Sequence, residues 1–432
     1  MRCGLVAAVM AAFVGAACGR RGDSAPASLD DASRAYMRLV LALGERDSDS
    51  LDSYHGPSEW RAQAQREHAT LETVRAAAIA LADSLRREAG AATDTEDARR
   101  RAFLIRQLGA VASRVDILQG ARPRFDDEAR VLFGLDPPGL GKPADGAEDR
   151  ELHSAAAARA ELDRLLPGQG ELAARYVAFD RQFLIPPDRL QAVLSRAIDG
   201  CRGATREHVA LPEGERVQVD YVPDLPWSAF TRYEGHFVSR VQVNTALPLS
   251  VDRALDLACH ETYPGHHTIA ALLDGKFGVT RPEFLIQPLF SPQTALHEAA
   301  ASIAPELAFP GATRIAFERD ELFPLAGLDP SGAAQQVAIG RLVDRLHGAE
   351  ADVARRYLDG ALDFPRAAAA LERDALMASA DATLKFVNQF RSYAATYTIG
   401  RDALSQVVAG DWASYLRAVT DPAQMVPGRG RK

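Results

Sequence analysis

Eight consecutive residues near the middle of the chain have the composition of a metal site. They are His260, Glu261, Thr262, Tyr263, Pro264, Gly265, His266 and His267. The first two repeat the start of the HExxH motif of zinc peptidases, in which two histidines one helical turn apart bind the metal and the glutamate is the general base. Proline stands where that motif has its second histidine, so a shared metal requires a different backbone path.

An unbroken α-helix would not bring these histidines together. Residues seven apart share a helical face but lie about 10.5 Å apart along the axis, and residues six apart lie on different faces. Pro264 cannot donate a helical hydrogen bond, and Gly265 can adopt conformations closed to other residues. We therefore expect a bulge that places His266, or alternatively His267, beside His260. The competing interpretation is a capped helix end with solvated histidines.

The predicted chemistry is hydrolysis assisted by one Zn²⁺ ion, which binds imidazole nitrogen at about 2.0–2.1 Å. Glu261 would accept the proton of a metal-bound water as that water attacks a carbonyl. A catalytic zinc usually keeps three protein ligands, so a third is expected downstream. Glu298 is the candidate, because it lies in an Ala- and Leu-rich segment of helical spacing where an unpaired charge would be costly. Its neighbour His297 is left a supporting or structural role.

The composition of the chain narrows the class of partner. Its 432 residues are 47% hydrophobic and 25% charged, as in an ordinary globular protein. The net charge of -8 is spread along the sequence, and no cluster of Lys and Arg could follow a phosphate backbone. We expect a peptide or small-molecule substrate and no nucleic-acid partner. Nothing in the sequence indicates an oligomeric state.

The N-terminus has the features of an export signal. Arg2 supplies positive charge, an apolar run extends from Leu5 to Val14, and small residues lead to Cys18. We expect residues 1–17 to be a cleaved signal peptide, Cys18 to carry lipid as in exported cell-envelope lipoproteins, and residues 18–28 to be a tether. The chain would then reach a membrane only through that lipid, since the apolar run is too short to span a bilayer.

Two cysteines, Cys201 and Cys259, remain as thiols after such cleavage. An oxidising compartment would permit a disulfide between them. Nothing in the sequence brings their Cα atoms within bonding range, and a cysteine beside His260 also suits a small buried apolar position. The sequence therefore favours unpaired cysteines.

Helices are the main elements expected to position these residues. From residue 29 to about 119 apolar residues recur three and four apart, for example at Leu71, Val74, Ala78, Leu81 and Leu85. A Pro- and Gly-rich stretch at 136–143 then divides an N-terminal helical region, 29–145, from a metal-binding catalytic region, 146–432. Strands are expected at 216–222 and 237–244. Further helices are expected at 151–166, 171–198, 292–307, 332–347, 349–358, 364–378 and 380–390. The predicted fold is mainly α, with a small β-ribbon before the metal-binding helix.

These motifs resemble a bacterial family known as domain of unknown function 885, whose marker is HExxPGHH followed by a helix that begins Glu-Gly-Trp-Ala. Residues 260–267 match the marker completely, and residues 298–301 match the second motif at its Glu and final Ala. A segment similar to the family's Arg-Leu-Val-Val-Asp-Thr-Gly-Leu-His, two residues shorter, ends at His347. Tyr397 begins a segment similar to Tyr-Lys-Ile-Gly. The resemblance extends over residues 180 to 405.

The family looks like a distant branch of the gluzincin metallopeptidases. The pair His297 and Glu298 is also similar to a His-Glu-Ser segment of the carboxypeptidase Taq family. The resemblance implies zinc-dependent, carboxypeptidase-like peptide hydrolysis in a multi-helix zincin-like fold, with His347 and Tyr397 in the site.

The transition state of such a reaction needs a donor for the developing oxyanion. Candidates are His347, Tyr393, Tyr397 and Arg391, with core packing as the alternative for the two tyrosines. The strand at 237–244 either offers its edge to an extended peptide or is a structural ribbon. The same ligands would also suit a zinc enzyme with a non-peptide substrate, and a non-catalytic cell-envelope lipoprotein could retain the fold.

Overall fold

The computed structural model describes residues 28–88, 96–136, 147–223, 227–278 and 280–421. The expected signal peptide, Cys18, nearly all of the tether and most of the Pro- and Gly-rich boundary lie outside these residues. Among the described helices, none combines the length and the apolar character needed to cross a membrane.

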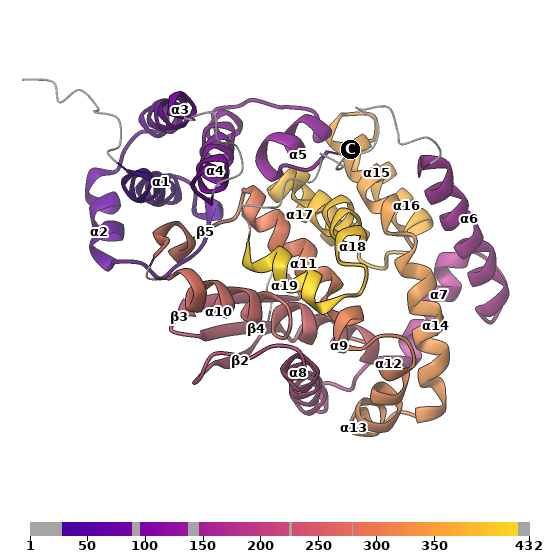
Figure 1. Cartoon of the computed structure of the whole chain (residues 1–432). Coiled ribbons are helices and arrows are strands. Elements are labelled where there is room, and N and C mark those ends of the chain that lie inside the picture. Colours follow the sequence, from indigo (N-terminus) through magenta and orange to yellow (C-terminus); the bar gives the residue numbers. More distant parts are fainter. Residues whose placement is uncertain (1–27, 89–95, 137–146, 224–226, 279, 422–432) are drawn as a thin grey trace, which may run out of the picture.

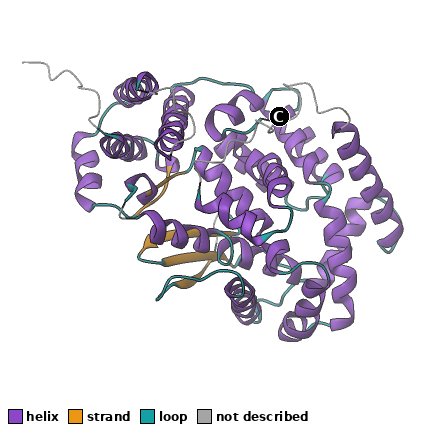
Figure 2. Cartoon of the chain, in the orientation of Figure 1, coloured by secondary structure: helices purple, strands orange, loops and turns teal. Residues whose placement is uncertain are grey.

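Helices dominate the structure, which is 69% helix and 8% strand and confirms the prediction of a mainly α fold (Figure 2). The N-terminal region forms α1 (Leu29–Gly44), α2 (Ser58–Glu67), α3 (Leu71–Arg87), α4 (Glu96–Leu118) and α5 (Phe125–Phe133). Hydroxyl side chains cap the N-termini of α1 and α3: Ser28 accepts a hydrogen bond from the backbone N–H of Asp31, and Thr70 accepts one from that of Thr73. The predicted apolar stripe of α3 faces inward: Val74, Ala78 and Leu85 are fully buried, and Leu71 and Leu81 are partly buried.

The two predicted regions share a hydrophobic core. One cluster combines residues of α1, α3 and α4 with residues of α10 (His266–Phe277), α11 (Pro292–Ala308) and α19 (Trp412–Thr420). Figure 1 shows α11 in the interior, with helices from both ends of the chain around it. Of the 17 residues of α11, 14 are buried, as expected for a helix that is apolar on most faces. The segment that carries Glu298 is therefore held by both regions.

A three-stranded sheet precedes the octapeptide in the chain. It consists of β2 (Arg216–Val222), β3 (Ala229–Gly235) and β4 (Val238–Asn244) in the order β2-β4-β3, with β2 parallel and β3 antiparallel to β4. The sequence predicted β2 and β4 and missed β3. Of the two alternatives for the strand at 237–244, the free edge for a peptide is wrong, because β4 is the central strand and is paired on both sides. The two edge strands are β2 and β3.

A second, two-stranded sheet links distant parts of the chain and was not predicted. Strand β1 (Leu51–Tyr54) pairs antiparallel with β5 (Ile286–Pro288). The pairing has a bulge between Leu51 and Ser53. Strands this short give little periodic signal in the sequence.

The other described helices match the sequence prediction only in part, because those at 312–317, 323–326 and 401–408 were not predicted. The other helices are α6 (Ala147–Leu165), α7 (Leu172–Asp180), α8 (Leu190–Arg206), α9 (Val251–Glu261), α12 (Ala312–Phe317), α13 (Phe323–Ala326), α14 (Ala333–Asp344), α15 (His347–Leu358), α16 (Phe364–Asp374), α17 (Ala380–Phe390) and α18 (Arg401–Val408). The continuous helix expected at 171–198 is wrong. Helix α7 ends at Asp180, a 3-10 turn follows to Phe183, and Pro186 and Pro187 lie in the loop before α8, where proline cannot donate a helical hydrogen bond.

A disulfide joins α8 to α9 through Cys201 and Cys259, whose Cα atoms are 5.4 Å apart. The expectation of unpaired cysteines is therefore wrong. The two residues are separated by 58 positions, and only the packing of α8 on α9 brings them together.

Candidate metal centre

The octapeptide forms the junction of two helices. Helix α9 ends at Glu261 and α10 begins at His266, with a cis peptide bond between Tyr263 and Pro264. The N–H of Gly265 donates to the carbonyl of Cys259 at 3.1 Å. A Cβ atom added to Gly265 would lie 1.9 Å from the carbonyl oxygen of His260, so only glycine fits. The predicted break at Pro264 and Gly265 is confirmed.

This break brings His260 and His266 together with Glu298 from α11. The Nε2 atoms of His260 and His266 lie 3.1 Å apart. Glu298 Oε2 is 3.5 Å from His260 Nε2, and Oε1 is 3.5 Å from His266 Nε2. Ligands of a tetrahedral ion with bonds of about 2.0–2.1 Å are separated by about 3.3 Å. The three side chains could therefore hold one metal ion between them.

Electrostatics at the triangle favour a cation. Burial opposes the charge of Glu298, yet the imidazoles of His266 and His260 hold its pKa well below the usual range. Burial alone would lower the pKa of His266, but the Glu298 carboxylate outweighs it and raises that pKa to about 9. Glu298 Oε2 is buried and accepts no hydrogen bond from the described residues. A carboxylate oxygen in that state needs a positive partner.

The third histidine of the motif faces the other way. His267 is fully buried, with Nδ1 2.8 Å from Ser239 Oγ and Nε2 3.1 Å from Glu215 Oε2. This leaves His266 as the candidate ligand, and His267 does not take its place. Glu215 also accepts from Tyr263 Oη at 2.5 Å and from Arg202 Nε at 2.9 Å.

Glu215 was missed by the sequence reasoning, because it lies 52 residues before His267 and has no motif around it. Burial favours its neutral form, yet hydrogen bonds from its three partners lower the pKa of Glu215 to about 2. The network fixes the ring of His267 and, with it, the start of α10.

Glu261, the predicted general base, is held by the edge strand β3. The hydroxyl of Thr231 on β3 donates to Glu261 Oε2 at 2.6 Å and lies 3.0 Å from the Glu261 carbonyl oxygen. The other carboxylate oxygen, Oε1, accepts no hydrogen bond from the described residues. Thr231 gave no signal in the sequence, since the strand that carries it was not predicted.

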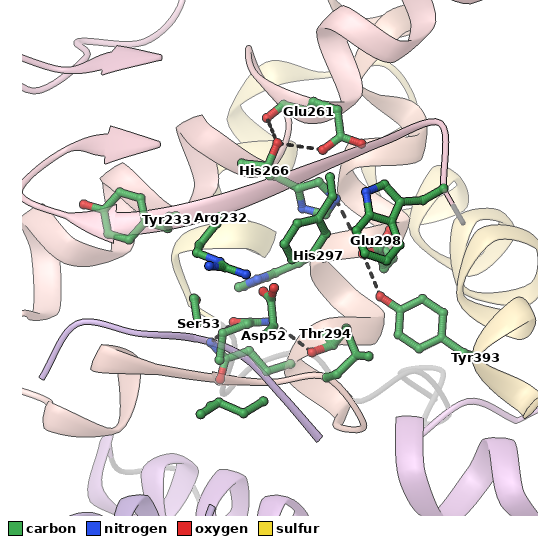
Figure 3. Close-up of a pocket in the computed structure, with 18 of the residues that line it drawn as sticks. Asp52, Ser53, Arg232, Tyr233, Glu261, His266, Thr294, His297, Glu298 and Tyr393 are labelled. Carbon is green, nitrogen blue, oxygen red and sulfur yellow. Dashed lines mark hydrogen bonds and ion pairs between the residues drawn. The ribbon is translucent and has the colours of Figure 1, made fainter. Parts of the chain in front are cut away.

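A cavity of about 400 Å³ opens beside the triangle. It is lined by most of the residues that the sequence singled out: His260, Glu261, His266, His297, Glu298, Tyr393 and Tyr397. Figure 3 shows Glu261, His266 and Glu298 gathered along one side of this cavity, with Asp52 and Ser53 of β1 across from them. Residues of the N-terminal region thus complete a wall that the sequence assigned to the region after residue 146.

Two tyrosines and one further histidine surround the three candidate ligands. Tyr393 Oη donates to Glu298 Oε1 at 2.8 Å, and the ring of Tyr397 lies 6.3 Å from the ring of His260. Burial, followed by the Glu298 carboxylate, raises the pKa of both tyrosines well above the usual value, so their hydroxyls stay protonated. Burial and the neighbouring His266 lower the pKa of His297 to about 3, so its ring is neutral.

His347 and Arg391 do not line the cavity. His347 begins α15, where its Nε2 lies 2.8 Å from Asp402 Oδ1. The Nε of Arg391 donates to Glu128 at 2.7 Å. Both groups are committed to acidic partners on other elements, so the expectation that they serve the site is not met.

Comparison with known proteins adds no relative: no family model matches the chain, and neither does any curated protein. The resemblance to the domain of unknown function 885 family stays a prediction.

Proposed function

We propose that this chain is a zinc-dependent hydrolase that cleaves peptides, with His260, His266 and Glu298 as the metal ligands. The observation that carries the proposal is the triangle of ligand atoms, 3.1 to 3.5 Å apart, at the wall of a cavity. When bound, a zinc ion supplies a Lewis acid that polarises a carbonyl and makes a water molecule acidic near neutral pH. The family resemblance and the zincin-like fold that it implies belong to the same proposal.

Glu261 is the general base in this proposal. Its carboxylate lines the same cavity, and Glu261 follows the ligand His260 in the sequence. Thr231 fixes the orientation of this carboxylate through Oε2. Oε1 is thus left to take a proton from the attacking water and to pass it to the leaving amine.

Tyr397 is the preferred donor to the oxyanion. Tyr393 donates its hydroxyl proton to Glu298 and so orients a ligand. Tyr397 lies in the π-helical segment Thr396–Gly400, and such segments are frequent at functional sites. Its protonated hydroxyl on the cavity wall can donate to developing negative charge.

The shape and lining of the cavity favour a peptide. Strand β3 is an edge strand, and residues 229–233 all line the cavity, so its backbone could pair with an extended substrate. Aromatic side chains cover much of the remaining wall: Trp227, Phe230, Phe386 and Phe390. Carboxypeptidase-like action, as the resemblance implies, is the narrower form of the proposal.

The predicted exported and lipid-anchored form is part of the proposal. The disulfide between Cys201 and Cys259 supports it, since disulfides persist in oxidising compartments outside the cytosol.

The test compares wild type with Glu261→Gln and Glu306→Gln. Glu306 is an exposed carboxylate on the same helix as Glu298, so its variant controls for the loss of one charge. Bound metal is measured by mass spectrometry, and cleavage is measured with a mixed peptide library. We expect one zinc in all three proteins and cleavage reduced about 10²- to 10⁴-fold in Glu261→Gln alone.

Two results would refute the proposal. One is metal-free protein after growth with abundant zinc, and the other is full cleavage by Glu261→Gln. Cleavage of esters or amides outside the peptide class, with peptides left intact, would keep the metal chemistry and reject the substrate.

A further inference from the structure

Strand β1 places three consecutive side chains, Leu51, Asp52 and Ser53, on the cavity wall. In a regular strand successive side chains point to opposite faces. The bulge between Leu51 and Ser53 makes Asp52 the extra residue of the pair with β5. Bulges re-aim side chains and are frequent next to active sites. The bulge therefore accounts for an acid directed at the cavity, as Figure 3 shows.

The carboxylate of Asp52 forms no hydrogen bond or ion pair with the described residues. Its Oδ1 atom is buried without a hydrogen bond, and neither of its oxygens accepts one from the described residues. Arg232 of β3 also lines the cavity but forms no ion pair with Asp52 within 4.0 Å. Burial raises the pKa of Asp52 to about 7, although the nearby positive charges of His266 and Arg232 act to lower it. A buried charge of this kind is costly unless something binds it.

The charges around the cavity favour a cation there. Among the described lining residues four are acidic, namely Asp49, Asp52, Glu261 and Glu298, and Arg232 is the one Lys or Arg. A divalent metal at the triangle would offset two of the four carboxylates, so the remainder is still negative. The aromatic wall suits a cation as well, because ring faces attract ammonium groups.

We infer that Asp52 is a specificity-determining residue that binds a primary ammonium group of the substrate. The inference rests on the proposed function, because it makes this cavity the substrate site. The ammonium can be the free amino terminus of a short peptide or the side chain of a lysine residue. Both present the same donor, and the experiment separates them.

The experiment measures binding by calorimetry to zinc-loaded Glu261→Gln protein, so that turnover does not interfere. The probes are Ala-Ala-Phe-Ala with a free amino terminus, its N-acetylated form, and acetyl-Lys-Ala-Phe-Ala. We expect at least one ammonium-bearing peptide to bind more tightly than acetyl-Ala-Ala-Phe-Ala. Adding Asp52→Asn should weaken the binding of that ammonium-bearing peptide about 10- to 100-fold. The affinity for acetyl-Ala-Ala-Phe-Ala should stay unchanged.

Two further variants control for fold and for general charge. Asp52→Glu keeps the carboxylate and should retain the preference for ammonium. Asp49→Asn removes a charge from the same wall, at a carboxylate that already accepts from Gln389 at 3.0 Å. It should leave the affinity ratio between the free and acetylated peptides as it was.

The outcomes separate this inference from the proposed function. Equal affinity for all three probes, equal losses for all three in Asp52→Asn, or no binding at all would overturn the role of Asp52. A different result would reject peptide hydrolysis and keep the ammonium site: wild type binds the ammonium peptides more tightly, the preference is lost in Asp52→Asn, and wild type cleaves none of these peptides.

Discussion

Replacing Gly265 with alanine would place a methyl group inside the turn that joins α9 to α10. The new Cβ would lie 1.9 Å from the carbonyl oxygen of His260 and 2.5 Å from that of Cys259. Both neighbours are backbone atoms, so neither can rotate away. Real Cβ atoms essentially never approach closer than 3.0 Å, and the turn must therefore open by about 1 Å.

The cost falls on both stability and metal binding. Overpacking of this kind costs about 1–3 kcal/mol, and losing the bond from the Gly265 N–H to Cys259 costs about 1 kcal/mol more. The two imidazole nitrogens are already 3.1 Å apart, close to the tetrahedral separation. A displacement of about 1 Å exceeds the roughly 0.2 Å that metal–ligand distances tolerate, so we expect zinc affinity to fall at least about 100-fold.

Zinc affinity is measured by competition with a chromophoric chelator, and unfolding by urea denaturation of the same samples. Gly203→Ala is the matched control, because a Cβ at this helical glycine of α8 meets nothing within 4 Å. That variant should bind zinc normally and gain up to about 1 kcal/mol of stability. A Gly265→Ala protein with wild-type zinc affinity would show that the turn does not position the ligands as we infer.

Two other predictions concern the groups that support the ligands. Glu215→Gln should destabilise the fold by about 3 kcal/mol at pH 7, because the pKa of Glu215 is lowered from 4.5 to about 2 in the folded protein. A group with a lowered folded pKa stabilises above its unfolded pKa, so the difference from wild type in urea unfolding should shrink as the pH falls from 4.5 toward 2, and a difference that grows instead would contradict this. Tyr393→Phe removes the donor to Glu298 Oε1 and should weaken zinc binding about 10- to 100-fold in the chelator assay with the fold intact. Unchanged zinc affinity in this variant would leave Tyr393 a packing role only.

Local chain geometry made part of the site predictable. The inability of an unbroken helix to join His260 and His266 follows from helical rise and twist, and Pro264 and Gly265 are the two residue types that can break it. Glu298 was found because a carboxylate among alanines and leucines demands a partner. Each of these steps uses neighbours within a few positions in the sequence.

The remaining features depend on contacts between distant segments, which no local pattern encodes. The choice between His266 and His267 is made by Glu215 and Ser239, which precede His267 by 52 and 28 positions. Asp52 reaches the cavity through a strand pair with residues 286–288. The His347 segment shows the opposite error, since a partial motif match suggested a site residue whose ring is instead bound to Asp402.

The doubled histidine can now be understood as two functions in one helical turn. Successive residues in a helix project about 100° apart, so if His266 faces the metal ligands, His267 must face another side. On that side it bonds Ser239 of the central strand and Glu215 just before β2, and so ties α10 to the sheet. Strand β3, at one edge of the same sheet, carries Thr231, which orients Glu261. In the proposed enzyme, the ligand His266, the general base Glu261 and strand β3 are therefore positioned by one connected set of bonds, and the role of His267 is to hold that set together rather than to bind the metal.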